Sequence, residues 1–344
     1  MSLFYEKTPA DETLWRSIIL FGRNVATYKL ALGKALIELA NQEKTFISLE
    51  ELAEPFSRYV CEHLKIVDKQ GISSRSRFLD VCRQYNGSQI DKNNLIQKTA
   101  ALGFVNVIDA FHVVGTGEIP KRFFMDERKQ RQGITITDDL ISLKENIQFT
   151  NFPYEVEARW RLVETAWSMN LSPHLLVAKY DEYNNLIFIE GTAKRRINIT
   201  SCKDSLNGYQ KGKCFYCFKD ILIDGSDPDR FVDVDHFFPY VVGINVRDVA
   251  FNINGIWNLV LSCKECNRGI KGKFDSIPSL NILERLHQRN EFFILSHHPL
   301  RETIINQTGT TPQDRINFMN EVDKIAYECR PHRWIPRNEH SPTL

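Results

Sequence analysis

The amino-acid sequence has little net charge and no long apolar run. Its 44 Lys and Arg residues nearly balance 43 Asp and Glu residues, which leaves a formal net charge of +1 in 344 residues. No field of one sign surrounds such a chain, so any surface that binds a polyanion must be local. No segment approaches the roughly 18 apolar residues that cross a membrane, and the first residues lack the basic and apolar parts of a signal peptide. We expect a soluble cytoplasmic protein with no membrane partner.

Internal repeats, heptads and low-complexity tracts are also absent, which excludes solenoids and long coiled coils. The chain is longer than one small metal-bound module, and its hydrophobic content of 42% can form at least one sizeable core. We expect an α+β fold that is mainly helical. It should comprise a mainly helical N-terminal domain for targeting or partner binding, a zinc-stapled module and a C-terminal helical extension. These parts span residues 1–195, 196–278 and 279–344.

Apolar residues recur at three- and four-residue spacing in several segments, which predicts amphipathic helices. These segments are residues 12–41, 91–102, 105–113, 154–169 and 280–294. Ser48 and Glu51 form a capping-box pattern that opens another helix. Thr311 before Pro312 is likewise typical of a helix start. Residues 175–190 place a polar turn between two apolar runs and predict a β-hairpin.

The eight cysteines follow two patterns. The isolated cysteines are Cys61, Cys82, Cys202 and Cys329. The other four form two C-x2-C pairs, Cys214 with Cys217 and Cys263 with Cys266. In a reducing compartment such pairs favour metal binding over disulfides. Four thiolates from two tight turns can close a tetrahedral zinc site, which would be structural because no coordination position stays open. The alternatives are four reduced cysteines that pack, or one redox-active pair.

Groups suited to hydrolysis lie between and beside the two pairs. Residues 231–239 form a strand-like run that contains Asp235 and His236, and Asn258 and Asn267 follow. Phosphodiester hydrolysis needs a base to deprotonate water and a cation to neutralise the phosphoryl oxygens. His236, Asp235 and a bound divalent ion could divide these tasks.

Residues 208–274 resemble the ββα-metal core of HNH nucleases, in which a strand ends in Asp-His, a loop carries Asn, and a helix after a second strand carries a final His or Asn. The resemblance implies that His236 is the general base and that Asn258 fixes the backbone beside it. It also implies that Asp235 and Asn267 hold the catalytic ion, for which these oxygen ligands favour Mg²⁺ or Mn²⁺. Asn267 stands where many members have His, a variant also found in the HNH module of RNA-guided nucleases.

Basic residues around the second cysteine pair could contact DNA phosphates. They are Lys264, Arg268, Lys271 and Lys273. The first three are spaced as one face of a helix, which could follow a phosphate backbone. A solvated helix face without a partner has the same spacing.

Structural interpretations of these residues remain open. Strand alternation places Asp235 and His236 on opposite faces, so one shared site requires the strand to end or bulge there. An Asp-His pair can also be purely structural, and Asn residues often occupy turns and caps. Asp233 shares the face of Asp235, and we expect it to support the site or to face solvent. His112 lies in an apolar pattern and is assigned to the core or to a domain interface.

The sequence therefore predicts a metal-dependent HNH-type endonuclease that hydrolyses DNA. One metal and one base cut one strand per engagement, so double-strand cleavage would need a homodimer or two successive events. The resemblance also suggests restriction or phage defence, with a homodimer or a defence protein as partner. Two alternatives stay open: a zinc-stapled DNA-binding module whose catalytic positions have lapsed, and an HNH nuclease directed at RNA.

Overall fold

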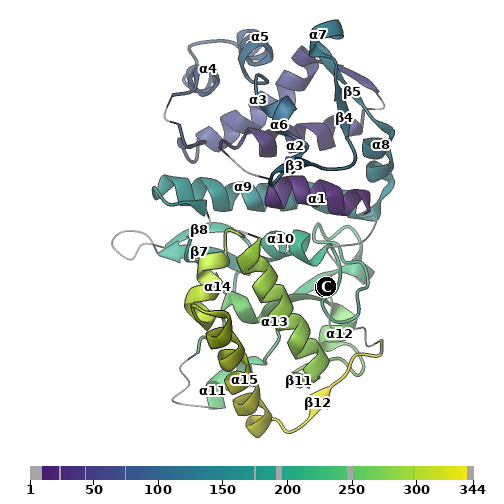
Figure 1. Ribbon diagram of the computed structural model, residues 1–344, viewed down its shortest axis with the longest axis vertical. Helices are drawn as coiled ribbons and strands as arrows, with labels where there is room; N and C mark the ends of the chain where they lie inside the picture. Colours follow the sequence, from purple (N-terminus) through teal and green to yellow (C-terminus); the bar gives the residue numbers. More distant parts are fainter. Residues whose placement is uncertain are drawn as a thin grey trace. The chain divides into compact units, whose positions relative to one another are not determined.

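The structure is a computed structural model that describes residues 10–22, 25–42, 44–73, 75–173, 176–190, 196–245, 251–296 and 298–338 (Figure 1). The chain forms two compact units that divide at Pro173. We call residues 10–173 the N-terminal unit and the residues after Pro173 the C-terminal unit. Helices predominate over short strands, which confirms an α+β, mainly helical fold. The predicted division into residues 1–195, 196–278 and 279–344, with a separate role for each part, stays a prediction.

The N-terminal unit is helical apart from one small sheet and one short hairpin. Its helices are α1 (Asp11–Phe21), α2 (Tyr28–Ala40), α3 (Leu49–Leu64), α4 (Arg77–Asn86), α5 (Lys92–Leu102), α6 (Val107–Ala110), α7 (Arg128–Arg131), α8 (Asp138–Glu145) and α9 (Phe152–Ser168). Its strands are β1 (Phe46–Ser48), β2 (Val113–Val114), β3 (Gly117–Glu118), β4 (Phe124–Asp126) and β5 (Gly133–Ile136). Strand β5 lies between β1 and β4 and is antiparallel to both, and β2 pairs with β3.

Most helices predicted from apolar spacing are present in this unit. The pattern over residues 12–41 corresponds to two helices, α1 and α2, and the pattern over residues 91–102 corresponds to α5. The prediction for residues 105–113 was too long, because only α6 forms there and β2 follows it. The capping box is confirmed: Ser48 Oγ accepts from the Glu51 amide, and the Ser48 amide donates to the Glu51 carboxylate.

Helix α2 lies at the centre of the N-terminal core. Leu30 and Leu36 are fully buried, and the helix packs against α3 and α9. Full burial of one leucine stabilises a fold by about 1.5–3 kcal/mol. Gly33 permits the close approach of α1, because a Cβ at that position would lie 2.9 Å from Ile19 Cδ1.

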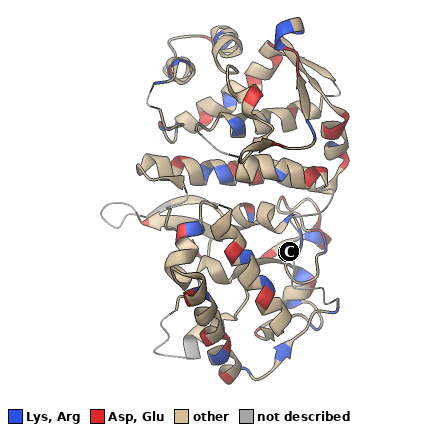
Figure 2. Cartoon of the chain, viewed as in Figure 1, with Lys and Arg blue, Asp and Glu red and all other residues tan. Residues whose placement is uncertain are grey.

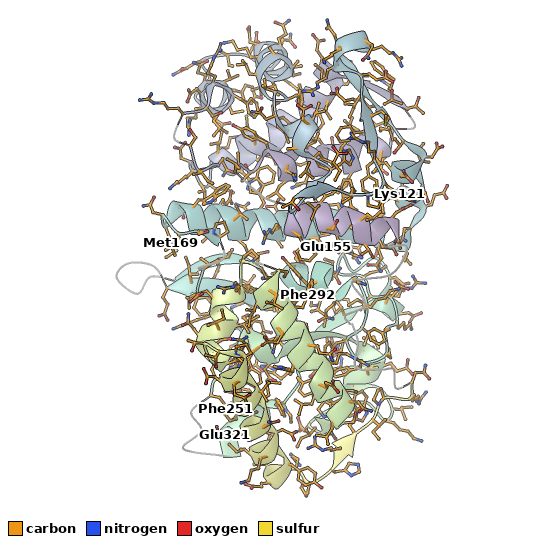
Figure 3. The ribbon with its side chains drawn as sticks, viewed as in Figure 1. Lys121, Glu155, Met169, Phe251, Phe292 and Glu321 are labelled. Carbon is orange, nitrogen blue, oxygen red and sulfur yellow. The ribbon has the colours of Figure 1, made fainter. Side chains whose placement is uncertain are left out.

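A buried ion pair joins α1 to α9. The Arg16 guanidinium donates to both carboxylate oxygens of Glu155, at 2.9 and 2.8 Å, and also to Gln148. Figure 3 labels Glu155, which belongs to α9. Because the contact is bidentate, it fixes the orientation of the two helices as well as their distance.

The C-terminal unit combines small sheets with helices. Its helices are α10 (Cys202–Asn207), α11 (Tyr240–Asn245), α12 (Lys264–Arg268), α13 (Leu280–Leu295), α14 (Arg301–Thr308) and α15 (Pro312–Cys329). Its strands are β6 (Lys179–Asp181), β7 (Leu186–Glu190), β8 (Arg196–Ser201), β9 (Val232–His236), β10 (Leu259–Cys263), β11 (Ile277–Pro278) and β12 (Arg333–Trp334). Strands β6, β7 and β8 form one sheet, β9 pairs with β10, and β11 pairs with β12.

Two local predictions for this unit are confirmed. Strands β6 and β7 form the predicted hairpin, with Lys179 opposite Phe188; residues 174–175 lie outside the described residues. Thr311 caps α15 by accepting from the Asp314 amide, and Pro312 occupies the first turn. Both features depend on neighbouring residues alone, which is why the sequence predicts them.

Two buried arginines tie α13 to the segments that carry the cysteines. Arg285 donates to the carbonyl oxygens of Phe215 and Tyr216, at 2.7 and 3.1 Å. Arg289 donates to the carbonyl oxygen of Trp257 at 2.8 Å and also to that of Leu259. Both arginine side chains are 0% exposed. Helix α13 therefore directly supports β10 and the loop between Cys214 and Cys217.

Charge is mixed in both units. Figure 2 shows basic and acidic residues interspersed on the helices of each unit, in agreement with the small net charge. Across the described ranges, no helix combines the length and the apolar character that crossing a bilayer requires.

Candidate functional site

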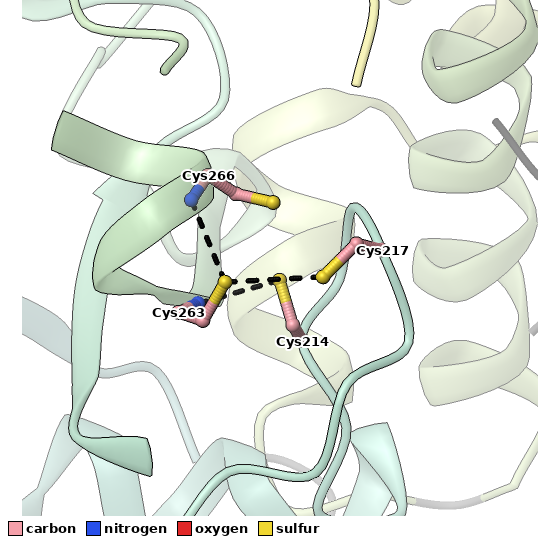
Figure 4. Close-up of side chains that lie close together, drawn as sticks. All are labelled: Cys214, Cys217, Cys263 and Cys266. Atoms are coloured by element: carbon pink, nitrogen blue, oxygen red, sulfur yellow. Dashed lines mark hydrogen bonds between the residues drawn. The ribbon is translucent and has the colours of Figure 1, made fainter. Parts of the chain in front are cut away.

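The four paired cysteines converge on one point in the C-terminal unit (Figure 4). Their sulfur atoms all lie within 4.8 Å of one another. Cys217 Sγ lies 3.8 Å from Cys263 Sγ. A tetrahedron with Zn–S bonds of about 2.3 Å has sulfur–sulfur edges of about 3.8 Å, so the spacing suits four-coordinate zinc. The cluster could hold a metal ion such as zinc, as the two C-x2-C pairs predict.

Local backbone geometry brings these sulfurs together. The Cys214 amide donates to the Lys219 carbonyl oxygen at 2.8 Å, and Phe218 adopts a left-handed φ of 58°, so the chain turns tightly around the first pair. The second pair spans the end of β10 and the start of α12. The Cys263 amide donates to Cys214 Sγ at 3.3 Å, which links the two pairs (Figure 4). Such N–H contacts favour the thiolate form that binds metal.

The end of β9 forms a pocket beside this cluster. Strands β9 and β10 are antiparallel, with His236 opposite Leu259 and Asp235 opposite Val260. A pocket of about 190 Å³ is lined by Asp235, His236, Pro239, Tyr240, Asn267, Arg268, Lys273, Phe274 and Asp275. Asp235, His236 and Asn267 therefore line one pocket. Because β9 ends at His236, strand alternation does not separate the two residues from a common site.

Asp235 is a buried carboxylate with two partners. Tyr216 Oη donates to one carboxylate oxygen at 2.6 Å, and Lys273 Nζ lies 3.3 Å from the other. Burial raises the pKa of Asp235 above its usual value, although Lys273 and Tyr216 act in the opposite direction. An ionised carboxylate offers about four lone-pair sites, so these two partners leave capacity for a cation.

His236 is oriented by Asn254, a residue of the loop that follows β9. Its Nε2 lies 2.7 Å from Asn254 Oδ1. Because an amide oxygen only accepts hydrogen bonds, Nε2 carries the proton of the neutral ring and Nδ1 is left with a free lone pair. Burial lowers the pKa of His236 below its usual value, which favours the neutral form. A neutral imidazole with a free Nδ1 can act as a general base.

Asn258 connects two segments of backbone. Its side-chain oxygen accepts from the Phe238 amide at 2.8 Å, and its side-chain nitrogen donates to the carbonyl oxygens of Phe238 and Ile253, at 3.0 and 2.9 Å. The side chain is 0% exposed. It thus holds the segment that follows His236 in place.

Asn267 and Asp233 contact one another at the edge of the pocket. Asn267 Nδ2 donates to Asp233 Oδ2 at 3.1 Å, and Arg268 donates to Asp233 at 3.0 Å. Asp233 therefore supports Asn267. The donation uses the amide nitrogen of Asn267 and leaves Oδ1 available as an acceptor. With the Asp235 carboxylate in the same pocket, these oxygen donors fit a hard cation such as Mg²⁺ or Mn²⁺.

The four predicted phosphate-contacting residues have different environments. Lys264, Arg268 and Lys271 are exposed. The single helical face predicted for them is wrong, because α12 ends at Arg268 and Lys271 has a left-handed φ of 64°. Lys273 is 0% exposed and contacts Asp235. Contacts of all four residues with phosphate stay a prediction.

Sequence reasoning missed several residues that build this site. Tyr216 lies inside the first C-x2-C pair, and Asn254 lies in the long loop between the strands. Arg285 and Arg289 support the site from α13. Their spacing in the sequence matches no motif, so only the position of Tyr216 between two metal-binding cysteines could have marked one of them.

Comparisons with models of known protein families, with curated proteins and with solved structures found no match. The HNH resemblance thus depends on the residues of the segment 208–274 alone. Within it, the carboxylate, imidazole and amide that the motif names line one pocket, and four cysteines cluster beside them.

Proposed function

We propose that the chain is an HNH-type endonuclease that hydrolyses DNA phosphodiester bonds, with His236 as general base. The observation that carries the proposal is the single pocket lined by Asp235, His236 and Asn267. An imidazole base beside two oxygen donors is the set that metal-assisted phosphodiester hydrolysis requires. A role in restriction or phage defence is part of the proposal at the level of the resemblance.

The residues of the pocket have distinct tasks in this reaction. His236 Nδ1 takes a proton from the attacking water, while Asn254 Oδ1 accepts a hydrogen bond from Nε2–H and fixes the ring. Asn258 holds the backbone that follows His236. Lys273 and Tyr216 fix the Asp235 carboxylate in position. The base is thereby presented in one tautomer and one orientation before substrate binds.

A hard divalent ion bound by Asp235 and Asn267 would neutralise the scissile phosphate and stabilise the departing 3′ oxygen. The products would then carry 3′-hydroxyl and 5′-phosphate ends. The four-cysteine zinc would have all its positions filled by sulfur, so its task is to hold the loop of Tyr216 and the start of α12 in place. Exposed Lys264, Arg268 and Lys271 would contact the phosphate backbone.

The test is a supercoiled-plasmid nicking assay with Mg²⁺ or Mn²⁺, on the wild type and on His236→Ala. We expect nicking by the wild type and a loss of at least about 100-fold in the variant, since general-base catalysis contributes about 10²–10⁴-fold. His332→Ala is the matched control, because His332 is exposed in the same unit and does not line the pocket. Undiminished nicking by His236→Ala would show that His236 is not the general base.

The same assay distinguishes the two alternatives. Metal-independent binding of DNA without cutting would indicate a zinc-stapled binding module whose catalytic positions have lapsed. Digestion of defined RNA but not of DNA, under the same conditions, would assign the site to RNA. Either result would contradict the proposed DNA endonuclease.

A further inference from the structure

The N-terminal unit contains a cavity of about 480 Å³. Small-molecule sites occupy about 300–1,000 Å³, so one ligand of nucleotide size fits. Part of the wall is apolar and includes Val25, Leu79 and Val107. Tyr28 and Ser76 add hydroxyl groups, which hydrogen bond to one another at 2.6 Å.

The charged residues of the wall are basic. Lys29 and Arg75 line the cavity, and no Asp or Glu is found among the described residues that line it. A cavity with this lining attracts an anion, and its apolar walls weaken screening by water.

Lys29 is a buried cation on the wall of this cavity. Its side chain is 6% exposed, and its Nζ donates to the Val113 carbonyl oxygen at 2.9 Å. No carboxylate in the described part of the chain forms an ion pair with it. Burial lowers the pKa of Lys29 to about 8, so the group is still mostly protonated at neutral pH. Buried charges in proteins are usually paired, and an anionic ligand would supply the missing pair.

The start of α2 adds a second feature on the same wall. The helix begins at Tyr28, beside Lys29, and has no side-chain N-cap. Thr27, at the cap position, instead donates its hydroxyl to Gln70 Oε1 at 2.9 Å. The first backbone N–H groups of a helix and its dipole favour a negative charge.

We propose that this cavity binds a phosphate-bearing small molecule with a ring, of the size of a nucleoside monophosphate. The phosphate lies against Lys29, Arg75 and the start of α2, and the ring lies against the apolar wall at Val25 and Leu79. The proposal concerns the N-terminal unit and does not depend on nuclease activity.

Titration calorimetry on the full chain tests this site with four probes: the four nucleoside monophosphates together, the four nucleosides, inorganic phosphate, and a 12-nucleotide single strand. We expect the monophosphates to bind at least tenfold more tightly than nucleosides or phosphate. No binding of the monophosphates at millimolar concentration, equal binding of inorganic phosphate, or tighter binding of the single strand would each overturn the proposal.

Variants assign the binding to this cavity. Lys29→Met keeps the length of the side chain and removes the charge, and it should weaken monophosphate binding at least tenfold. Lys129→Met is the matched control, because Lys129 is exposed on α7 and does not line the cavity. Arg75→Gln changes an exposed residue and should weaken binding even if Lys29→Met does not fold. Wild-type affinity in Arg75→Gln and in a folded Lys29→Met would contradict the proposed site.

Discussion

At the scale of single residues, the pocket depends on side chains that hold other side chains. Tyr216 and Lys273 hold Asp235, Asn254 holds His236, and Asp233 contacts Asn267. The sequence predicts Asp235, His236 and Asn267 as site residues, because their types and order match a motif. It does not predict their supports, because a hydrogen bond such as that of His236 with Asn254 depends on how the long loop folds.

Replacement of Asn254 tests this dependence. In Asn254→Ala the Nε2 proton of His236 loses its acceptor, so the ring is free to rotate and to change tautomer. We expect the nicking rate to fall by about 10- to 100-fold, as for other residues that orient active-site ligands. Asn254→Asp keeps an acceptor oxygen and should retain most of the activity, and Asn320→Ala is a control on the exposed face of α15. A wild-type rate in Asn254→Ala would show that His236 needs no such support.

At the scale of elements, α13 supports the segments that carry the site. Its arginines donate to buried main-chain carbonyl oxygens, and that of Trp257 also accepts from Asn290 Nδ2 at 3.1 Å. The sequence predicts the helix from its apolar series but not this contact. Short strands such as β1, β4 and β5 were also missed, because they have only three or four residues each, and β1 pairs with β5 far along the chain. Caps at Ser48 and Thr311 were predicted because they are local.

Removal of Arg289 measures what this contact contributes. Arg289→Met leaves the carbonyl oxygen of Leu259 without this donor, while that of Trp257 keeps Asn290 Nδ2 at 3.1 Å, so the cost is about 1–3 kcal/mol for one buried group. We expect the free energy of unfolding of the C-terminal unit to fall by about 1–3 kcal/mol in urea titrations. Gln288→Met, on the same helix, should change it by less than about 0.5 kcal/mol. Equal stability of the two variants would contradict a supporting role for Arg289.

At the scale of the whole molecule, apolar spacing predicts the mainly helical fold but not the division at Pro173. That division depends on which segments pack together. The assignment of His112 to the core is confirmed, since it is 2% exposed and its Nε2 accepts from the Phe123 amide at 3.0 Å. Burial lowers the pKa of His112 from 6.5 to about 4, so the folded chain keeps this ring neutral.

The stability of the whole chain should therefore depend on pH through His112. Below pH 6.5 the unfolded chain binds a proton at His112 and the folded chain does not, so acid favours unfolding. The contribution of neutral His112 to the free energy of unfolding is therefore complete above pH 6.5 and is lost as the pH falls towards 4. The loss amounts to about 3 kcal/mol at about 1.36 kcal/mol per pKa unit. His112→Gln keeps an acceptor and cannot titrate, so its unfolding free energy should fall less between pH 7.5 and pH 4.5. Equal losses of unfolding free energy in the wild type and in His112→Gln would contradict this role of His112.

We propose that Asp235 and Asn267 hold one hard divalent ion beside His236. Electron paramagnetic resonance of free Mn²⁺ measures this binding without any assumption about substrate. We predict one Mn²⁺ per chain, with affinity at least tenfold lower in Asp235→Asn and in Asn267→Ala, while the zinc content of both variants stays that of the wild type. Unchanged Mn²⁺ binding in both variants would contradict the claim.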